Sequence, residues 1–476
     1  MGWKRTGNGK GEMRGSLHFA RCAPVGMSEC LGGVEEIRQR QEQRQRPIRG
    51  FWLRQNDDAG RVMRYGGWMG VGTGMRRQLP PWAMGLAIAP LGFYYGFVST
   101  ALPILLRARG VSVGEIAWVS AVGFSPTFWA FLLCPILDVR FSKRAYALTF
   151  AAVAAVCLGV STMLTGNLVA FTAVVTAGCA AIVMFGNTHG GWMPDVIEDK
   201  HYSQVGGSSN VANLGAAGLF ATLVVVLVRT LSAPVAAGLL GLTVMAPTVL
   251  LFFIPLPAKK RRGARETFSH FFGDLYRVCR RPGCVLGLIC FVSPTACFAL
   301  TNLFSGVGSD FHTPERWVTA LNGTGMAVAC SLGCLAGMWI CGRFQRRTVY
   351  VVSGFGGAAA ALGLIRAPHT LLFFAVGVLV YDFFTGINYT AFTSLEYEIV
   401  GSGNPLASTQ FALLSASANL PISYMTAVDG HFHTTHGLGG MLAVDALSSI
   451  VVGTVLLVVF HRMGHLGKRA EMAVAG

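Results

Sequence analysis

Twelve long apolar stretches limit this chain to one class of fold. Most of them approach about 20 residues, the length that an α-helix needs to cross a hydrocarbon core about 30 Å thick. They predict an all-α polytopic membrane protein with twelve transmembrane helices at 82–106, 116–137, 145–164, 167–187, 210–228, 235–256, 284–308, 318–341, 349–365, 371–393, 408–428 and 439–460.

The positive charge lies almost entirely on one side of these spans. Of the 38 Lys and Arg residues, 33 fall in the tails and in alternate loops, and the other loops hold only Arg107, Arg109, Arg229, Arg316 and Arg366. The positive-inside rule therefore predicts that both termini are cytoplasmic. The net charge of +16 is explained by short loops beside the membrane, so we expect no nucleic-acid partner.

The apolar pattern divides the chain into five segments. Residues 1–76 are rich in Gly, Arg and Gln, which predicts a disordered basic tail; the alternative is a later translation start at Met63, Met69 or Met75. A basic run at 259–262 and aromatic residues at helical spacing then predict an amphipathic helix on the inner membrane surface. The expected segments are the tail, an N-terminal bundle of six helices (82–256), this cytoplasmic linker (257–283), a C-terminal bundle (284–460) and a cytoplasmic tail (461–476).

Three short motifs recur at equivalent places in the two sets of six spans. Residues 140–144 (RFSKR) follow span two and 343–347 (RFQRR) follow span eight, while 207–210 (GSSN) and 407–410 (ASTQ) open spans five and eleven. Gly186 and Gly386 lie in spans four and ten, each shortly before an Asn. These repeats predict two pseudo-repeated six-helix bundles with a solute path between them near the midplane.

A duplicated twelve-helix bundle with a short basic turn after span two resembles the major facilitator superfamily. The superfamily's turn has an Asp followed by Arg and further basic residues, as Asp138 and the residues after it do here. Such charges can pair across the cytoplasmic face and hold one conformation; the alternative is that they serve only as membrane anchors. We expect a cytoplasmic gate formed by Asp138, Arg140, Lys143, Arg144, Arg343 and Arg346.

Four stretches resemble, more narrowly, the AmpG-like muropeptide permeases and their acetyl-CoA-transporter relatives. They lie within 102–112, 126–138, 382–391 and 408–415, and the last (STQFALLS) is the most specific. That family commonly carries a Lys in span two and acids in span four, where this chain has Ala130, Gly186 and Gly190. Losing the cation and its acidic partners together avoids an unpaired charge in low dielectric. The resemblance implies import of a muropeptide-like cell-wall fragment or a similar amphiphile, with protons, across a bacterial inner membrane.

Two carboxyl groups are expected inside the membrane, Asp382 in span ten and Asp445 in span twelve. A charged and unpaired carboxylate is costly there, so such groups usually face a cavity and often handle protons or cations. We expect both to take part in proton coupling. The alternative is an acid bonded to a neighbouring hydroxyl group.

Uncharged polar residues cluster where a central cavity is expected. Amide, hydroxyl and aromatic groups suit a neutral or weakly charged amphiphile, although each residue alone could simply bond two helices together. The expected cavity lining is Tyr94, Tyr95, Asn187, His189, Asn388, Tyr389, Asn419 and Tyr424.

We expect no cofactor and no metal site. His431, His433 and His436 are expected in an outer loop between spans eleven and twelve, without a nearby Cys to complete a metal site. Residues 70–74 (GVGTG) lack the ending of a phosphate-binding loop. Without a nucleotide-binding domain, transport is expected to be secondary and driven by gradients.

The sequence therefore predicts a monomeric secondary transporter of the inner membrane that works by alternating access. Its expected partners are the lipid bilayer, a small-molecule solute and protons, and it is not expected to be an enzyme. One alternative is a siderophore or drug carrier on the same fold. Another is a membrane-embedded transferase, for which His189 and Asp195 are the plausible catalytic pair.

Overall fold

The structure, a computed structural model, describes residues 79–462 except Arg140, 258–268, 270–271, 274 and 278. The chain divides into two compact units, Met1–Met75 and Arg76–Gly476, and every described residue belongs to the second. The predictions for residues 1–76, for most of the linker helix, for Arg140 and for the tail beyond 462 therefore lie outside the described residues. Below, residues 79–257 are called the N-half and 279–462 the C-half.

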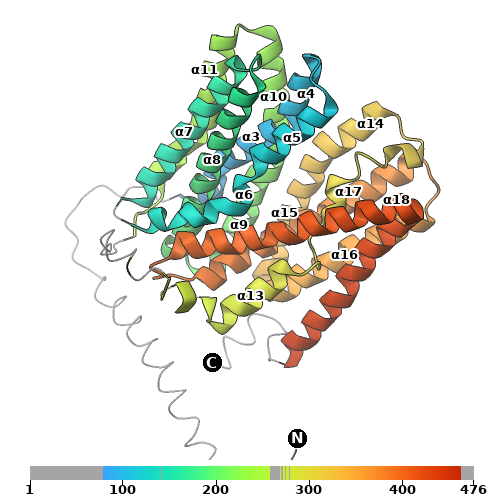
Figure 1. The fold of residues 1–476 in the computed structure, drawn as a ribbon. Helices are drawn as coiled ribbons and strands as arrows, with labels where there is room; N and C mark the ends of the chain where they lie inside the picture. The colour runs from blue at the N-terminus through green and yellow to red at the C-terminus, as the bar shows by residue number, and fades with distance from the viewer. Residues whose placement is uncertain are drawn as a thin grey trace, which may run out of the picture. The chain divides into compact units, whose positions relative to one another are not determined.

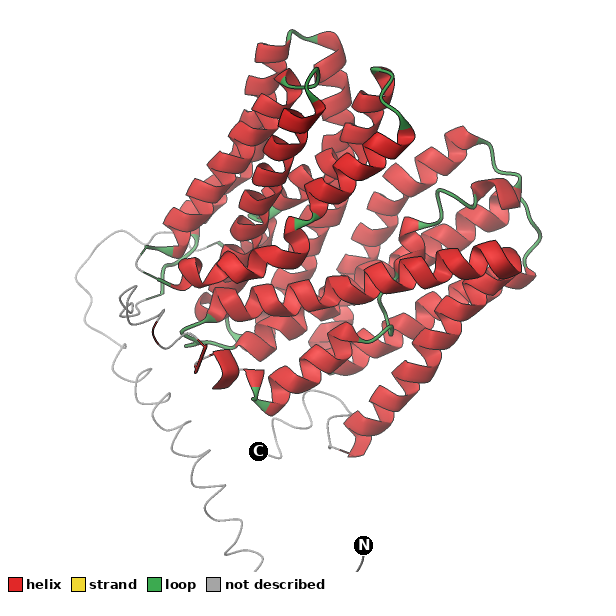
Figure 2. Cartoon of the chain, viewed as in Figure 1, coloured by secondary structure: helices red, strands yellow, loops and turns green. Residues whose placement is uncertain are grey.

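The described part of the chain is built from helices joined by short loops (Figure 2). Ten of its helices are long and apolar enough to cross a membrane. They are Pro81–Ala108, Gly114–Asp138, Lys143–Met163, Leu168–Val196, Asp199–Thr230, Ala233–Phe253, Glu315–Arg343, Arg346–Arg366, Leu371–Val400 and Ala407–Arg462. The last of these carries two predicted spans, and predicted span seven is interrupted, which accounts for ten helices where twelve were expected.

Several of these helices change pitch along their length and so contain more than one labelled element (Figure 1). The N-half contains α2 (Pro81–Leu86), α3 (Ala89–Gly96), η1 (Phe97–Ala101), α4 (Leu102–Ala108), α5 (Val113–Phe124), α6 (Pro126–Trp129), η2 (Ala130–Asp138), α7 (Lys143–Met163), α8 (Leu168–Val196), η3 (Asp199–His201), α9 (Tyr202–Asn210), η4 (Val211–Gly215), α10 (Ala216–Thr230), α11 (Ala233–Met245) and η5 (Ala246–Phe253). The C-half contains α13 (Pro282–Val292), η6 (Ala299–Asn302), η7 (Gly308–Phe311), α14 (Glu315–Ala320), η8 (Leu321–Gly325), α15 (Met326–Arg343), α16 (Arg346–Arg366), α17 (Leu371–Val400) and α18 (Ala407–Arg462).

Side-chain caps define where several helices begin. Ser112 and Glu115 form a capping box at the start of α5, and Ser142 and Asn167 accept hydrogen bonds from the backbone at the starts of α7 and α8. Each cap satisfies a backbone N–H that has no partner inside the helix. Short polar residues between the apolar stretches therefore fix the helix ends at the membrane boundary.

Glycines allow the helices of each half to touch backbone to backbone. A Cβ at Gly96 of α3 would lie 2.0 Å from the carbonyl oxygen of Ala217 in α10, and one at Gly386 of α17 would lie 2.1 Å from that of Cys330 in α15. In a membrane, helix association depends on such close packing because lipid tails are as apolar as Leu. The many small residues of the sequence thus hold α3 against α10 and α15 against α17.

Predicted span seven (284–308) is not one helix, which corrects the sequence expectation. Its helix α13 ends at Val292, and the chain is non-helical at 293–298, with positive φ angles of 59° at Ala296 and 55° at Phe298. Pro294 disfavours helix in the residue before it and lacks an N–H group. Ser449 of α18 accepts a hydrogen bond from the Ala296 amide at 3.3 Å, so one backbone group freed by the break is satisfied inside the protein.

The predicted outer loop between spans eleven and twelve is also wrong. Helix α18 continues from Ala407 to Arg462 with a single non-helical residue, Gly437, at φ 68°. Glycine adopts this left-handed conformation without a Cβ clash, so the chain reverses direction at one residue. His431, His433 and His436 accordingly lie in a helix and not in a loop.

Two other helices extend past their predicted ends. Predicted spans four and ten end at 187 and 393, whereas α8 continues to Val196 and α17 to Val400. Apolar windows stop at the first group of polar residues, but a helix continues as long as its backbone bonds and packing are satisfied. This extension brings further polar side chains between the two halves.

Candidate functional site

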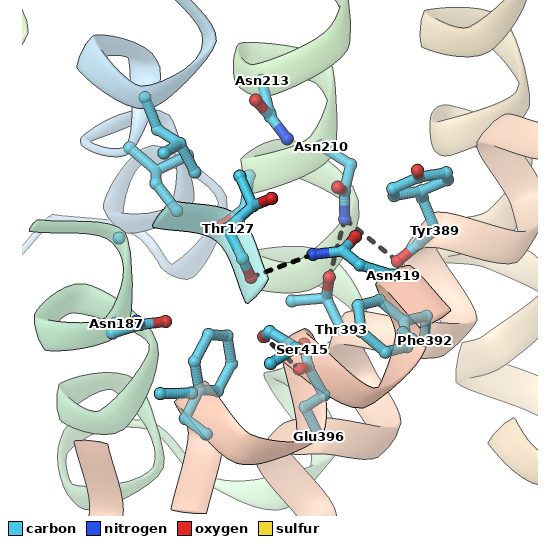
Figure 3. Close-up of a pocket in the computed structure, with 18 of the residues that line it drawn as sticks. Thr127, Asn187, Asn210, Asn213, Tyr389, Phe392, Thr393, Glu396, Ser415 and Asn419 are labelled. Atoms are coloured by element: carbon cyan, nitrogen blue, oxygen red, sulfur yellow. Dashed lines mark hydrogen bonds between the residues drawn. The ribbon is translucent and has the colours of Figure 1, made fainter. Parts of the chain in front are cut away.

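A central cavity of about 230 Å³ lies between the N-half and the C-half (Figure 3). Its wall carries polar side chains from both halves: Thr127, Asn187, Ser209, Asn210, Asn213, Asn388, Thr393, Glu396, Ser415 and Asn419. Aromatic side chains make up much of the rest: Tyr95, Phe131, Tyr350, Tyr389, Phe392, Tyr397 and Phe411. An apolar and aromatic wall with a few polar groups is typical of a small-molecule site.

Amide side chains bond the two halves together along this cavity. The Asn210 Nδ2 atom of α9 donates to the Thr393 hydroxyl at 2.9 Å and to the Tyr389 carbonyl oxygen at 3.0 Å, both in α17 (Figure 3). Asn419 of α18 donates to the Thr127 carbonyl oxygen of α6 at 3.4 Å. A solute that competes for these groups therefore interacts with both halves at once.

Glu396 is the acidic group among the described residues of the cavity wall, and it was not predicted from the sequence. It is 1% exposed, and its Oε1 atom accepts a hydrogen bond from the Ser415 hydroxyl at 2.5 Å. The described lining contains no Lys, Arg or His. Glu396 was missed because predicted span ten ends at 393, but its spacing from Tyr389 and Thr393 follows one helical face and would have revealed it.

The structure brings five of the eight predicted cavity residues to the wall. These are Tyr95, Asn187, Asn388, Tyr389 and Asn419. Whether they bind a solute stays a prediction.

The other three predicted cavity residues do not line it. The Tyr94 hydroxyl donates to the Val175 carbonyl oxygen at 2.9 Å, and the Tyr424 hydroxyl donates to that of Val292 at 2.8 Å. The His189 Nε2 atom lies 3.0 Å from the Met84 carbonyl oxygen. These three side chains join helices inside one half, which is the alternative that the sequence left open.

Neither of the two predicted proton-coupling acids lines the central cavity. Asp382 of α17 is 1% exposed, and its Oδ1 atom has no hydrogen-bond partner among the described residues. Asp445 of α18 is 5% exposed and its Oδ2 atom accepts a weak hydrogen bond from the Tyr381 hydroxyl at 3.4 Å. Their role in coupling remains a prediction.

Asp138, at the end of η2, binds the start of α18 in the other half. Its Oδ1 atom accepts from the Ser408 amide at 3.0 Å, and its Oδ2 atom accepts from the Thr409 amide at 3.0 Å and hydroxyl at 2.8 Å. Lys143 donates to Asp138 at 2.7 Å and to the Ser408 hydroxyl at 2.6 Å. A carboxylate at a helix N-terminus satisfies free N–H groups and complements the helix dipole.

Arg346 makes a second bridge between the halves on the same face of the molecule. Its Nη1 atom donates to Asp199 of the N-half and to Glu398 of the C-half, each at 2.7 Å, and its Nη2 atom donates to the Asp199 carbonyl oxygen at 2.6 Å. Its side chain is 1% exposed. Arg346 was predicted as a gate residue, whereas neither acid was, because both lie next to helix ends, where acids are common. We call the face that carries Asp138, Lys143 and Arg346 the basic face.

The remaining predicted gate residues do not bridge the halves in the described structure. Arg144 donates to the carbonyl oxygens of Leu251 and Ile254 at 2.9 and 2.7 Å, all within the N-half. The Arg343 guanidinium stacks on the Trp339 ring at 3.9 Å. Arg140 lies outside the described residues.

Two glycines allow the halves to pack closely against each other below the cavity. A Cβ at Gly190 of α8 would lie 2.2 Å from the Phe411 ring, and one at Gly191 would lie 2.5 Å from the Ser408 backbone. No side chain fits at Gly190 in this conformation, so α8 and α18 approach each other closely there.

The described cross-half hydrogen bonds lie between the central cavity and the basic face. They involve residues such as Asn210, Asn419, Asp138 and Arg346, together with Gly403, whose amide donates to Asp195 at 2.8 Å. Among the described residues, none joins the halves on the opposite side. The described hydrogen bonds between the halves thus lie on one side of the cavity, while α10 packs against η8 and α15 without such bonds.

Comparison with solved structures shows several transporters of the same fold. The human organic anion transporter MFSD10 (TETRAN) has a TM-score of 0.61 and 15% identity, covering 79% of this chain and 98% of that one. The transporter FucP in the outward conformation has a TM-score of 0.61 and 14% identity over 79% and 98% of the two chains. A variant of the E. coli fucose:proton symporter FucP has a TM-score of 0.59 at 12% identity over 79% and 97%. None of the curated proteins compared with this sequence matches it.

The sequence model of the Major Facilitator Superfamily matches residues 84–426. This match confirms the predicted superfamily and its all-helical polytopic fold, while the finer resemblance to the AmpG-like permeases stays a prediction. Proteins of this kind lie in membranes and move small solutes, and they are not enzymes. With its helices, its central cavity and this match over most of its length, the chain belongs to the Major Facilitator Superfamily.

Proposed function

We propose that this transporter couples solute movement to protons and that Glu396 binds the coupling proton. The proposal rests on the lack of a cationic partner for this carboxyl group among the described lining residues. It is 1% exposed, it has a hydroxyl partner, and no cation stands among the described lining residues. A carboxylate buried without a cation is costly, so Glu396 is stable in the cavity when it holds a proton or pairs with a cationic solute.

The proposed solute is a small amphiphile that is uncharged or cationic. Its polar part would bond amides such as Asn187, Asn210 and Asn419, and its apolar part would lie against the aromatic wall. An organic anion meets no counter-charge among the described lining residues.

The size of the cavity narrows the solute further. Its 230 Å³ is smaller than the roughly 300–1,000 Å³ of sites for drug-sized ligands. Within the muropeptide-like expectation, this favours a single amino sugar or a short peptide over a whole disaccharide peptide. A fucose:proton symporter shares the fold, and a monosaccharide is a solute of the right size.

We further propose that the basic face is cytoplasmic and that the described conformation is outward-facing. The positive-inside rule supports the first point. The bridges made by Asp138 and Arg346 below the cavity support the second, because they would have to open for the cavity to reach the other side. Import then requires the two halves to rock about the central cavity.

Transport by purified protein in lipid vesicles tests this proposal. The panel contains a labelled amino sugar, a dipeptide, a primary amine, an organic anion and a muropeptide fragment, each with and without an inward proton gradient. We expect gradient-driven uptake of at least one uncharged or cationic solute. Glu396→Gln should lower that uptake at least tenfold, because the amide cannot exchange a proton.

Glu315→Gln serves as the matched control, since Glu315 is an exposed acid at the start of α14, away from the cavity. It should transport like the natural protein. Gradient-driven uptake that survives in Glu396→Gln, or transport restricted to the organic anion, would contradict the proposal.

A further inference from the structure

A second group of buried ionisable side chains lies in the C-half, outside the wall of the central cavity. It forms where the non-helical segment 293–298 of predicted span seven meets α17 and both arms of α18. Its acids are Asp429 and Asp445, each eight residues from the reversal at Gly437, and therefore at similar depth on antiparallel helices. Asp445 was predicted to take part in proton coupling, and neither acid lines the central cavity with Glu396.

Asp445 borders a small space next to the non-helical segment. Tyr381, Cys297 and Ser449 also line this space. Its volume of about 10 Å³ is close to the room that one water molecule needs. Asp445 therefore accepts one weak hydrogen bond, from the Tyr381 hydroxyl at 3.4 Å, and borders a space of water size that Tyr381 also lines.

Asp429 approaches the same place from the first arm of α18. Met425, one helical turn before it, packs against Cys297 and Ala299 of the segment after α13. Asp429 is 0% exposed, and neither of its carboxyl oxygens has a hydrogen-bond partner among the described residues. Asp445 and Met425 thus both approach Cys297, which places the two acids around the same non-helical segment.

The group continues to the surface on the side opposite the basic face. His433 follows Asp429 by four residues on the same helical face. Its Nε2 atom lies 3.0 Å from the Asp310 Oδ2 atom, and these side chains are 36% and 35% exposed. A surface pair that can exchange protons with water thus stands one helical turn from a buried carboxyl group.

At its inner end the group meets the central cavity. Ala296 and Cys297 line both the small space beside Asp445 and the central cavity that contains Glu396. The two spaces share this thin wall of non-helical backbone, in which a rearrangement needs no helix to be broken.

We propose that Asp429 and Asp445 share one proton and form a route by which protons travel between the surface at His433 and the central cavity. Two carboxylates in one desolvated place cannot both be charged at low cost, so the pair retains one proton. A proton bound by His433 or Asp310 passes to Asp429, Asp429 passes one to Asp445, and Asp445 passes one through water to the cavity. At each step one group loses the proton that the next group gains.

The groups that face the pair are Tyr381 of α17, Cys297 of the span-seven segment, and His433 with Asp310 at the surface end. None of the four carries a fixed positive charge that would stabilise two carboxylates. This inference rests on the proposed proton coupling, because the route ends at Glu396.

Infrared titration of the reconstituted protein tests the pair without knowledge of the solute. The carbonyl band of protonated carboxyl groups is followed against pH in the natural protein and in Asp429→Asn, Asp445→Asn and Glu396→Gln. In either pair variant the remaining acid faces a neutral amide, so its transition should move at least one pH unit towards acid. Glu396→Gln should remove a different part of the band and leave the transition of the pair in place.

Asp382→Asn is the matched control, because Asp382 is another buried acid of the C-half with a free carboxyl oxygen. Asp382→Asn should remove the carbonyl band of Asp382 and leave the transition of the Asp429 and Asp445 pair at the same pH. Unchanged titration in both pair variants would overturn the inference. If the transition of the Asp429 and Asp445 pair shifts as expected but Glu396→Gln changes neither the carbonyl band nor transport, the proposed function is overturned instead.

A second measurement guards against variants that fail to fold. Dicyclohexylcarbodiimide reacts with protonated carboxyl groups in apolar surroundings, and mass spectrometry locates the adduct in the natural protein. We expect modification at Asp429 or Asp445, and absence of both adducts would count against the shared proton.

The route itself has a kinetic test. After a rapid pH jump, His433→Gln should slow protonation of the pair at least threefold without moving its transition. An unchanged rate would overturn the route.

Discussion

The Asp138 carboxylate of the N-half caps the first turn of α18 in the C-half through Thr409, whose amide and hydroxyl lie 3.0 and 2.8 Å from the Oδ2 atom. The Asp138 side chain is 1% exposed and is also paired with Lys143 at 2.7 Å. The buried Asp138 carboxylate therefore caps a helix, pairs with a cation and joins the two halves. Conformational change must separate these groups.

Replacement of that charge should open the basic face. In Asp138→Asn the amide keeps the size of the side chain but loses charge-assisted hydrogen bonds, each worth about 1.5–3 kcal/mol. A loss of about 2 kcal/mol shifts the balance between conformations roughly 30-fold. In a background without reactive cysteines, Asn419→Cys should then react at least tenfold faster with an impermeant maleimide added at the basic face.

Glu198→Gln is the control for this experiment, because the Glu198 side chain lies on the same face and is 69% exposed. It should leave the labelling rate within twofold. Equal labelling of Asp138→Asn and the control would show that Asp138 does not hold the halves together.

The Arg346 guanidinium should not be replaceable by an ammonium group. It contacts Asp199 and Glu398 in different halves through donors fixed in one plane, and Lys presents a single charged point. Both acids are partly hydrated, at 57% and 38% exposed, so we expect Arg346→Lys to cost about 1–2 kcal/mol. Thermal unfolding in detergent should show a lower midpoint than Arg343→Lys, in which a ring contact is lost without a bridge between the halves. A smaller loss for Arg346→Lys would contradict this ranking.

A larger side chain at Gly191 should prevent closure of the basic face. A Cβ there would lie 2.5 Å from backbone atoms of Ser408, and backbone cannot yield as a flexible side chain does. Gly191→Val should therefore favour conformations in which α8 and α18 are apart, seen as faster labelling from the basic face. Gly238→Val is the matched control, because nothing lies within 4 Å of a Cβ at that glycine. Identical labelling of the two variants would disprove the steric argument.

Cys279, outside the spans, should react slowly with thiol reagents at neutral pH. Burial, with a smaller effect of Cys284, raises the pKa of the Cys279 thiol to about 11. The reactive thiolate is therefore scarce at pH 7, and its amount grows roughly tenfold per pH unit until the pKa is reached. Maleimide labelling followed by mass spectrometry should show this rise between pH 7 and pH 10. A rate that levels off near pH 9 would indicate an ordinary, hydrated thiol.

Much of the fold could be predicted because membrane-spanning helices appear in the sequence as long apolar stretches. The break at 293–298 was not, since Ala296, Cys297 and Phe298 continue the apolar stretch after only three less apolar residues. Ser293 and Pro294 were visible in the sequence, and a proline after a short polar residue indicates where a helix can end. The satisfying partner, Ser449, is 153 residues from Ala296 and could be found only in three dimensions.

The residues of the site were harder to predict, because the apolar windows and the helices do not end at the same residues. Asn187, Asn388 and Asn419 were identified because they are polar residues inside or beside apolar windows. Glu396 and Asp429 were missed because the windows end before them, although the helices continue. Tyr94 illustrates the opposite error: it lies inside a span but faces Val175 of its own half.

The single-residue reversal at Gly437 means that the two arms of α18 cannot slide independently. A tilt of the first arm, where Asp138 binds it, acts on the second arm, which carries Asp445, through a connection of one residue. Opening at the basic face is thereby linked to the surroundings of a buried acid near the opposite end of the hairpin, with no intervening loop between the arms.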